Sequence, residues 1–269
     1  APGIRMHHFP AEGKARNVAY EIVNYLCPKD KEFSIPIISV TGTNGKTTTV
    51  RMINHILRGI NKCVGTTTTD GVYINDECVK QGDNTGPISA KTILMDHNVE
   101  YAVLETARGG IINKGLGYDI ADVGIITNIQ EDHLGIDGVY TLDDLAYVKS
   151  LVVEAVKNTG YAVINADDDN CIKILDRLKS NIIFFSIKDN NEYVLKHIKA
   201  GGIAFYYNGE SIVLNKGDKE VNVIEIKNIP SALGGILKYN IYNALAAASG
   251  AYAAGINLFD IEKGLSTFK

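Results

Sequence analysis

The chain has 269 residues, of which 45% are hydrophobic and 22% charged, and its formal net charge is −4. This is the composition of an ordinary globular protein, and the length allows one large domain or two small ones. With no clustered basic face, no apolar run of roughly 18 residues and no N-terminal signal peptide, we predict a cytoplasmic protein that binds neither nucleic acid nor membrane. The scattered positions of Cys27, Cys63, Cys78 and Cys171 indicate reduced thiols rather than a zinc site or a disulfide framework.

The first 34 residues are expected to be a linker with one weakly amphipathic helix from Arg16 to Leu26. From residue 35 onward, continuous apolar runs predict buried strands. These are Ile37–Val40, Tyr101–Leu104, Val123–Ile126, Tyr161–Ile164 and Ile182–Phe185. Helical patterns alternate with them, at Lys46–Leu57, Ile88–Asp96, Leu142–Val156 and Cys171–Leu178.

Shorter strands of another kind are expected at Gly71–Val79, as a hairpin, and between Ile203 and Ile226, with turns at Asn208 and Lys216. Two helices close the chain, Asn240–Ala253 and Leu258–Phe268. Buried strands that alternate with helices indicate an α/β fold with a mostly parallel sheet flanked by helices. The short strands predict a small antiparallel sheet added to it.

The segment VTGTNGKTTT, residues 40–49, lies between the first predicted strand and the first predicted helix of this sheet. Glycines there allow a close backbone approach to phosphate, and the helix N-terminus offers unpaired N–H groups and partial positive charge. A lysine and a threonine next to them suit the β- and γ-phosphates and Mg²⁺. The residues expected to bind nucleotide are Gly42, Thr43, Asn44, Gly45, Lys46, Thr47 and Thr48.

This loop departs from the usual P-loop, because Val40 stands where that motif has its first glycine. The departure argues against an ordinary GTPase or kinase loop. The alternative is a plain capped turn before a helix, with Thr43 or Asn44 as the cap.

Glu105 ends the strand YAVLE, and ligands gather at the carboxyl ends of parallel strands. A carboxylate at that point can hold a metal ion near phosphates, although it can also be a solvated strand-end residue. Arg108, beside two glycines, is a candidate clamp for phosphate or carboxylate. Its alternative is a surface arginine in a loop.

His133 follows the next strand end, in the segment TNIQEDHL. Together with Thr47 and Glu105 it is a candidate ligand of Mg²⁺ or substrate. Magnesium prefers oxygen, so Asp132 is the alternative for the same role.

Lys149 lies on a predicted helix where its neighbours one turn away are apolar. An amine in such surroundings is costly unless it is neutralised, paired or modified. The alternative is a lysine whose chain reaches along the surface to solvent.

These segments together carry a family likeness. The loop TGTNGKT after a strand, Glu105, TNIQEDHLG, a helix with Lys149 and ILKYNIYNALAAASGAYAAG resemble the central ATPase domain of Mur ligases over about residues 36–269. That family also includes folylpolyglutamate synthetase, and its phosphate loop commonly lacks the outer glycine.

Three further segments are similar to the branch of the family that makes cyanophycin, a polyaspartate with arginine branches. They are APGIRMH (1–7), GDNTGPISAK (82–91) and ETARGGIINKGLGYD (105–119). The likeness implies that residues 1–34 connect to an ATP-grasp domain, that residues 35–269 form the Mur-like central domain, and that a C-terminal Mur domain lies outside this sequence. Residues 1–269 alone are therefore expected to bind nucleotide weakly and to turn over little.

The resemblance also implies roles for single residues. Gly42, Asn44, Gly45 and Lys46 cradle the ATP phosphates, and Thr47 holds a first Mg²⁺ with Glu105. His133 matches the histidine that contacts a second Mg²⁺, and Lys149 matches a lysine that many Mur ligases carry as a carbamate.

Asn240 and Asn243 match the paired asparagines near adenine and ribose, with Tyr239 in place of the family histidine. Capping of the last long helix is the alternative role for these asparagines.

The implied reaction is ATP-driven amide formation: Lys46, Glu105, His133, Lys149 and Arg108 assist the activation of an aspartate β-carboxylate, and arginine then supplies the amine. A polar turn is expected to bind the end of the polymer, through Asp83, Asn84, Thr85, Ser89 and Lys91, with a rigid surface turn as its alternative.

The implied partners are the polymer, free arginine, the adjacent domains and further copies of the full-length chain as a homo-oligomer. Two other interpretations stay open. One is another Mur-family ligase of the folylpolyglutamate or peptidoglycan-precursor type, and the other is a non-catalytic nucleotide-binding scaffold.

Overall fold

The structure, a computed structural model, describes residues 7–8, 16–17, 22, 25, 34–131 and 134–269. It divides into two compact units, Ala1–Ile35 and Pro36–Lys269. In the first unit, β1 (His7–His8) pairs antiparallel with β2 (Arg16–Asn17). The prediction of a helix starting at Arg16 is therefore wrong at its first two residues, because their backbone is engaged in strand pairing.

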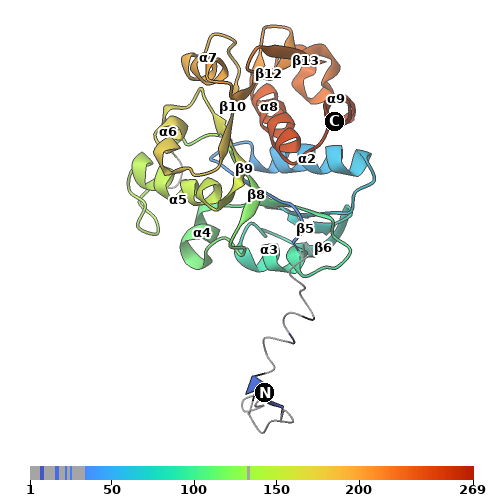
Figure 1. The fold of residues 1–269 in the computed structure, drawn as a ribbon, viewed down its shortest axis with the longest axis vertical. Helices are drawn as coiled ribbons and strands as arrows, with labels where there is room; N and C mark the ends of the chain where they lie inside the picture. The colour runs from blue at the N-terminus through green and yellow to red at the C-terminus, as the bar shows by residue number, and fades with distance from the viewer. Residues whose placement is uncertain (1–6, 9–15, 18–21, 23–24, 26–33, 132–133) are drawn as a thin grey trace. The chain divides into compact units, whose positions relative to one another are not determined.

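The second unit is built on one sheet of eleven strands (Figure 1). In spatial order the strands are β13 (Lys219–Glu225), β12 (Ser211–Lys216), β11 (Ile203–Tyr207), β10 (Asn181–Ser186), β9 (Val156–Asn165), β8 (Ala121–Ile126), β3 (Ile37–Thr41), β7 (Tyr101–Glu105), β4 (Val64–Thr67), β5 (Gly71–Ile74) and β6 (Glu77–Gln81). The seven strands from β11 to β4 run parallel, and two antiparallel strands extend each edge. The predicted antiparallel strands thus continue the main sheet at both edges.

Helices cover both faces of this sheet (Figure 1). One face carries α2 (Lys46–Gly59), α8 (Lys238–Ala253) and α9 (Leu258–Thr267), which pack against one another and against a large apolar cluster. The other face carries α3 (Pro87–Leu94), α4 (Arg108–Lys114), α5 (Leu142–Glu154), α6 (Asp169–Ile172) and α7 (Glu192–Lys199). Short 3-10 turns lie at Leu175–Arg177, Ile226–Asn228 and Pro230–Gly235. Among the residues described, no helix is both long and apolar enough to cross a bilayer.

The alanine-rich sequence of α8 follows from how closely this helix lies on the sheet. Residues 244–251 of α8 are all buried. A β-carbon on Gly250 would lie 2.4 Å from the Cδ1 atom of Ile125, so a larger side chain would force the helix away from β8. Small residues here let α8 and α2 share one face, and this places the N-terminus of α8 beside the loop after β3.

Most predicted elements are present with ends shifted by a few residues. The predicted helix Cys171–Leu178 is the main exception, because α6 starts earlier, where the Asp168 side chain accepts a hydrogen bond from the amide of Asn170, and a separate 3-10 turn follows. The strand β4 and the helices α4 and α7 were not predicted. For α4 the reason is physical: two of its seven residues are glycines, which have low helix propensity.

Candidate active site

Three adjacent strand ends create the site. β3 lies between β7 and β8 and runs parallel to both, so the loops after these strands meet at one edge of the sheet. After β3 the chain adds β4 and β7 on one side of this strand, and it then adds β8 on the other side. The strand order therefore reverses at β3, and open α/β sheets bind ligands at such a switch point. These loops carry the phosphate-loop candidate, Glu105 and the segment that begins at Thr127.

Two glycines give the loop after β3 its shape. Gly42 and Gly45 have φ values of 151° and 84°, which favour glycine. Space is also restricted at both positions. A β-carbon on Gly42 would lie 1.9 Å from Oγ1 of Thr127, and one on Gly45 would lie 2.2 Å from Oδ1 of Asn243.

The loop is fixed from the side of β8. The amide of Thr43 donates to the carbonyl of Asn128 at 3.0 Å, and the amide of Asn44 donates to Oδ1 of Asn128 at 2.9 Å. The Thr127 hydroxyl donates to the carbonyl of Asn44 at 2.6 Å. The first-turn amides of α2 have no partner within the helix, so the loop presents N–H groups at a positive helix end, as an anion site requires. The alternative of a capped turn does not apply, since α2 has no side-chain cap.

Lys46, Thr47 and Glu105 come together beneath this loop. Nζ of Lys46 donates to the carbonyl of Thr43 at 2.9 Å, so its chain folds back across the loop. The Thr47 hydroxyl donates to Oε2 of Glu105 at 2.8 Å. Glu105 is only 1% exposed, which rules out a solvated strand-end residue.

The Glu105 carboxyl is incompletely satisfied. Its Oε1 atom is buried and has no hydrogen-bond partner in the described part of the chain. Burial raises the pKa of Glu105, while the Thr47 hydroxyl and the charge of Lys46 oppose that shift. A buried carboxylate oxygen without a partner, next to a threonine hydroxyl, is a set of oxygen donors that fits Mg²⁺. The described residues contain no cluster of three or more His, Cys, Asp or Glu side chains that could hold a metal.

Arg108 is held by the turn that follows the segment TNIQEDHL in the sequence. Its Nη1 atom donates to the carbonyl of Ile136 at 3.0 Å, and Nη2 lies 3.3 Å from Oδ2 of Asp137. The side chain is 14% exposed and begins α4, so Arg108 is neither in a loop nor on the open surface. The predicted residues Asp132 and His133 lie outside the described residues.

Lys149 faces the phosphate-loop candidate from α5. It is 2% exposed and Nζ donates to the Thr43 hydroxyl at 3.2 Å. The alternative of a lysine that reaches along the surface is therefore wrong. Lys149 therefore contacts the Thr43 side chain while Lys46 contacts the Thr43 carbonyl, so two lysines contact one residue of the loop.

Asn240 and Asn243 form a chain of hydrogen bonds at the start of α8. Nδ2 of Asn243 donates to Oδ1 of Asn240 at 3.2 Å, and Nδ2 of Asn240 donates to the carbonyl of Ser231 at 2.7 Å. No side chain caps α8, so the capping alternative is not observed. The two amides instead connect the turn at 230–235 to the position of Gly45.

A cavity of about 1000 Å³ opens beside the loop. Its lining includes Asn44, Gly45, Thr48, Asn128, Asn165, Asp167, Asp168, Tyr239, Asn240, Tyr242 and Asn243. This volume is at the upper end for small-molecule sites. Thr48, Asn240 and Asn243 were predicted to bind nucleotide, and they line this space together with Asn44 and Gly45.

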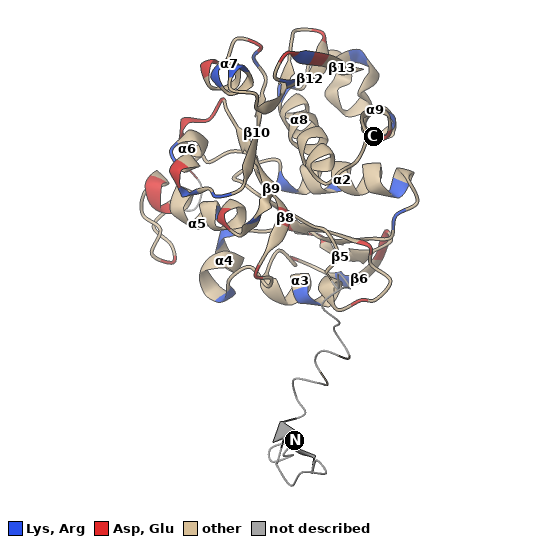
Figure 2. Cartoon of the chain, viewed as in Figure 1, with Lys and Arg blue, Asp and Glu red and all other residues tan. Residues whose placement is uncertain are grey.

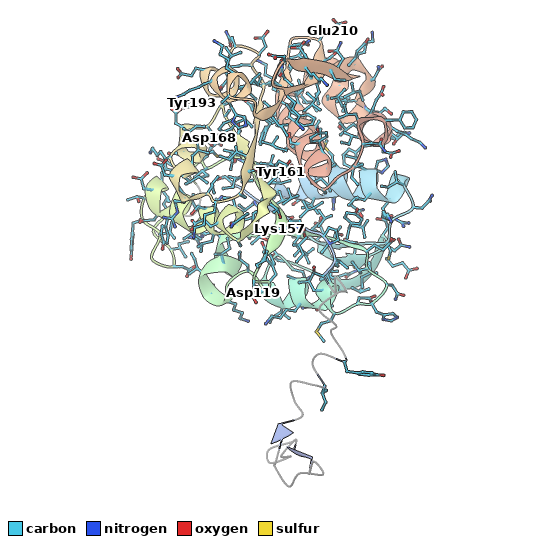
Figure 3. The ribbon with its side chains drawn as sticks, in the orientation of Figure 1. Asp119, Lys157, Tyr161, Asp168, Tyr193 and Glu210 are labelled. Carbon is cyan, nitrogen blue, oxygen red and sulfur yellow. The ribbon has the colours of Figure 1, made fainter. Side chains whose placement is uncertain are left out.

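Sequence reasoning missed the acidic residues of this cavity. Asp168, labelled in Figure 3, accepts from the amide of Ile129 at 2.7 Å and so joins the loops after β8 and β9. Asp167 accepts from the amide of Ile187 at 2.7 Å, and burial raises the pKa of the nearby Tyr242 hydroxyl. The signal was present as ADDD directly after the strand YAVIN, which places carboxylates at another parallel strand end.

A smaller cavity of about 310 Å³ lies by the segment GDNTGP. Asp83, Asn84, Thr85 and Ser89 line it, as do Lys80 and Lys114, while Lys91 is exposed and not part of the lining. Asn84, Thr85 and Ser89 are buried, so the alternative of a plain surface turn is wrong for them. The Ser89 hydroxyl donates to Oδ1 of Asn84 at 3.0 Å, and the Thr85 hydroxyl donates to Oδ1 of Asp83 at 2.8 Å.

The parallel sheet, the glycine-containing loop after β3 and the contact between Thr47 and Glu105 place a candidate phosphate site at the strand ends of an α/β domain. The chain belongs to the Mur ligase family, because residues 40–251 match the model of the Mur ligase middle domain. It is 47% identical over 269 residues to the cyanophycin synthetase of Trichormus variabilis, covering all of this chain and 30% of that relative. It is 30% identical over 250 residues to the UDP-N-acetylmuramate–L-alanine ligase of Caldicellulosiruptor bescii, covering 93% of this chain and 48% of that one.

Solved structures support the fold. The chain is similar to a UDP-N-acetylmuramoyl-L-alanyl-D-glutamate–2,6-diaminopimelate ligase with a TM-score of 0.68 and 20% identity, over 93% of this chain and 49% of that one. The sequence thus spans about a third of the length of its cyanophycin synthetase relatives, and about half of the other two ligases.

Proposed function

We propose that this chain is the ATP-dependent domain of an acid–amino-acid ligase that joins arginine to the β-carboxylate of aspartate in cyanophycin. The observation that carries the proposal is the Thr47–Glu105 contact beneath a phosphate-type loop, together with the buried Oε1 of Glu105, which has no hydrogen-bond partner among the described residues. In this proposal residues 35–269 bind ATP, and residues 1–34 connect to another domain of a longer protein.

Nucleotide would bind with its phosphates at the first turn of α2 and its nucleoside in the cavity of about 1000 Å³. Gly42 and Gly45 allow the close approach, and Lys46 turns from the Thr43 carbonyl toward the β- and γ-phosphates. Carboxylates such as Asp168 suit ribose hydroxyls, which are hydrogen-bond donors. Tyr239 is 71% exposed at the rim and offers an aromatic face to the base.

Magnesium would be held by the Thr47 hydroxyl and the Glu105 carboxylate, and His133 is proposed as a ligand of a second ion. When bound, the metal neutralises charge on the phosphate oxygens. Lys149 is proposed to act as a carbamate, since an anion suits a metal site better than an ammonium does. Arg108, held by Asp137, is proposed to steady the anionic groups that react.

The reaction would proceed by two transfers. An oxygen of the acceptor carboxylate attacks the γ-phosphorus of ATP, ADP leaves, and an acyl phosphate forms. The α-amino nitrogen of arginine then attacks the acyl carbon, loses a proton, and inorganic phosphate leaves with the carboxylate oxygen. The protein's task is positioning and charge stabilisation, because phosphoryl transfer needs little covalent assistance.

The cyanophycin substrate is favoured over the other ligase types by the extent of the similarity. Identity of 47% covers the whole chain, including residues 1–39 that precede the matched family domain, whereas the peptidoglycan-type relative is 30% identical. The scaffold alternative is disfavoured, since a protein without catalysis gains nothing from a buried carboxylate oxygen that has no partner in the part of the chain that the structure describes.

The test is ADP release by the full-length protein that carries this sequence. It would be given ATP, Mg²⁺ and an acceptor of aspartates bearing arginine branches and ending in an unbranched aspartate. The proposal expects ADP release only when both the acceptor and arginine are present. Equal release with glutamate and a folate, or with a peptidoglycan precursor, would contradict it.

A further inference from the structure

The cavity beside GDNTGP is lined by basic groups that have no role in the proposed reaction as described above. Lys80, at β6, and Lys114, at the end of α4, both line this cavity of about 310 Å³. Both lysines are exposed, and neither makes an ion pair with a described carboxylate. Figure 2 shows basic positions on α3 and α4 at the same end of the molecule as β6.

Among the described residues that line the cavity, Asp83 is the one acidic residue. One of its oxygens is turned inward, where it accepts from the amide of Thr85 at 3.2 Å and from the Thr85 hydroxyl at 2.8 Å. With two lysines and one aspartate, the described part of the lining has a net formal charge of +1. Of the two organic substrates proposed above, one is a cation, arginine, and the other ends in carboxylates. The charge of this cavity therefore favours the acceptor.

The wall of the cavity is continuous with the strand end that carries Glu105. The amide of Ala107 donates to the carbonyl of Thr85 at 3.4 Å. A β-carbon on Gly110 would lie 3.1 Å from that same carbonyl, so the start of α4 lies directly against the segment DNTGP. On the other side, the amide of Asn84 donates to the carbonyl of Thr68 at 3.1 Å, next to Thr69, whose hydroxyl lies 3.4 Å from that of Thr47.

The terminal aspartate of such an acceptor has two carboxylates, and they have different roles in the proposed reaction. The one that is activated must reach the Thr47–Glu105 site, where its oxygen attacks phosphorus. The other, the main-chain carboxylate, takes no part in the chemistry and can be held by ammonium groups. We propose that Lys80 and Lys114 bind this main-chain carboxylate and so select acceptors that end in a free α-carboxylate. This inference rests on the proposed function for the identity of the acceptor.

Binding measurements test it without relying on catalysis. Two acceptor peptides would be used, both with arginine-branched aspartates and an unbranched terminal aspartate, one with a free α-carboxylate and one with an α-carboxamide. Their dissociation constants for the full-length protein would be measured by calorimetry without ATP. The wild type is expected to bind the free-carboxylate peptide about 10-fold more tightly, and the preference should shrink at high salt.

Lys80→Gln and Lys114→Gln should each weaken binding of the free-carboxylate peptide about 3-fold, and together remove the preference. Neither should change the dissociation constant of the carboxamide peptide. Lys199→Gln, which alters an exposed lysine at the end of α7, is the control and should change neither value. Equal binding of the two peptides by the wild type, or equal weakening of both in the lysine variants, would overturn the inference. A failure of the proposed function would show separately, as absence of acceptor-dependent ADP release.

Discussion

Oδ1 of Asn243 lies 2.2 Å from the point where a β-carbon on Gly45 would stand. Gly45 is therefore required for two independent reasons, the space taken by this amide and its φ of 84°. This close approach also brings the Asn243 side chain on α8 against Gly45, the residue that precedes the first turn of α2. Through it, the position of α8 fixes the loop proposed to bind phosphate.

Gly45→Ala is expected to weaken binding of a non-hydrolysable ATP analogue at least 10-fold, because the clash and a left-handed alanine, which costs about 1–2 kcal/mol, both distort the loop. Calorimetric titration measures this. Gly59→Ala is the matched control at the other end of α2, where an added β-carbon meets nothing within 4 Å. Unchanged affinity of Gly45→Ala would contradict the requirement for glycine at this position.

Glu105→Gln should stabilise the protein when no divalent ion is present. Burial raises the pKa of Glu105 in the folded chain. The folded state therefore binds more protons than the unfolded state, and the free energy of unfolding falls as pH rises from about 4.3, the unfolded value, through the folded value. At pH 7.5 the neutral glutamine should be more stable by about 1 kcal/mol, and near pH 4 the difference should nearly vanish.

The same substitution should abolish the Mg²⁺ dependence of nucleotide binding, because one oxygen donor loses its charge. Urea unfolding at both pH values, with and without Mg²⁺ and nucleotide, measures both effects. If Glu105→Gln were less stable than the wild type at pH 7.5 without metal, burial of the charged Glu105 carboxylate would not be destabilising, and this prediction would be wrong.

Lys149→Met is expected to lower turnover of the full-length protein by about 100-fold or more while the protein stays folded. The side chain is 2% exposed and contacts the Thr43 hydroxyl, and it is the proposed carbamate. Carbon-13 NMR with labelled bicarbonate should show one carbamate resonance in the wild type and none in the variant. Lys173→Met, which removes an exposed pair with Asp143, should change neither. Full activity of Lys149→Met would rule out its role.

Asp168→Ala should destabilise the domain by about 1–3 kcal/mol, since it removes both a helix cap and the acceptor of the Ile129 amide. It should also weaken nucleotide binding, because the loops after β8 and β9 lose their connection. The neighbouring Asp169→Ala is the control for stability, as the exposed Asp169 side chain makes no hydrogen bond with the described residues. Thermal unfolding compares the two, and an equal shift in Tm would contradict the assigned role of Asp168.

The strands and the phosphate loop could be predicted because they follow local rules. Apolar runs such as Ile37–Val40 and Val123–Ile126 signal buried parallel strands wherever they occur, and a glycine-rich turn before a helix has one common use. The closeness of Thr47 and Glu105 also followed, since parallel strand ends meet at one edge.

Other contacts join residues that are far apart in the sequence, and local sequence patterns do not predict such contacts. The pairing of Arg108 with Asp137 joins residues 29 apart, and that of Asn240 with the Ser231 carbonyl requires a turn with left-handed Leu233 and Gly234. From the sequence, a surface arginine in a loop therefore stayed open as the alternative for Arg108, and helix capping stayed open as the alternative for Asn240 and Asn243. The lysines of the smaller cavity were missed because β6 and α4 are brought together only by the packing of the start of α4 on the segment DNTGP.

The central claim is that the acceptor carboxylate is activated through an acyl phosphate at the Thr47–Glu105 site. The most direct measurement is the fate of carboxylate oxygen. Full-length protein would be given ATP, Mg²⁺, arginine and an acceptor whose terminal side-chain carboxylate carries oxygen-18 at both oxygens, and the released phosphate would be analysed by mass spectrometry. The account predicts one oxygen-18 atom in each phosphate released. Unlabelled phosphate, formed together with ADP and the arginine amide, would contradict it.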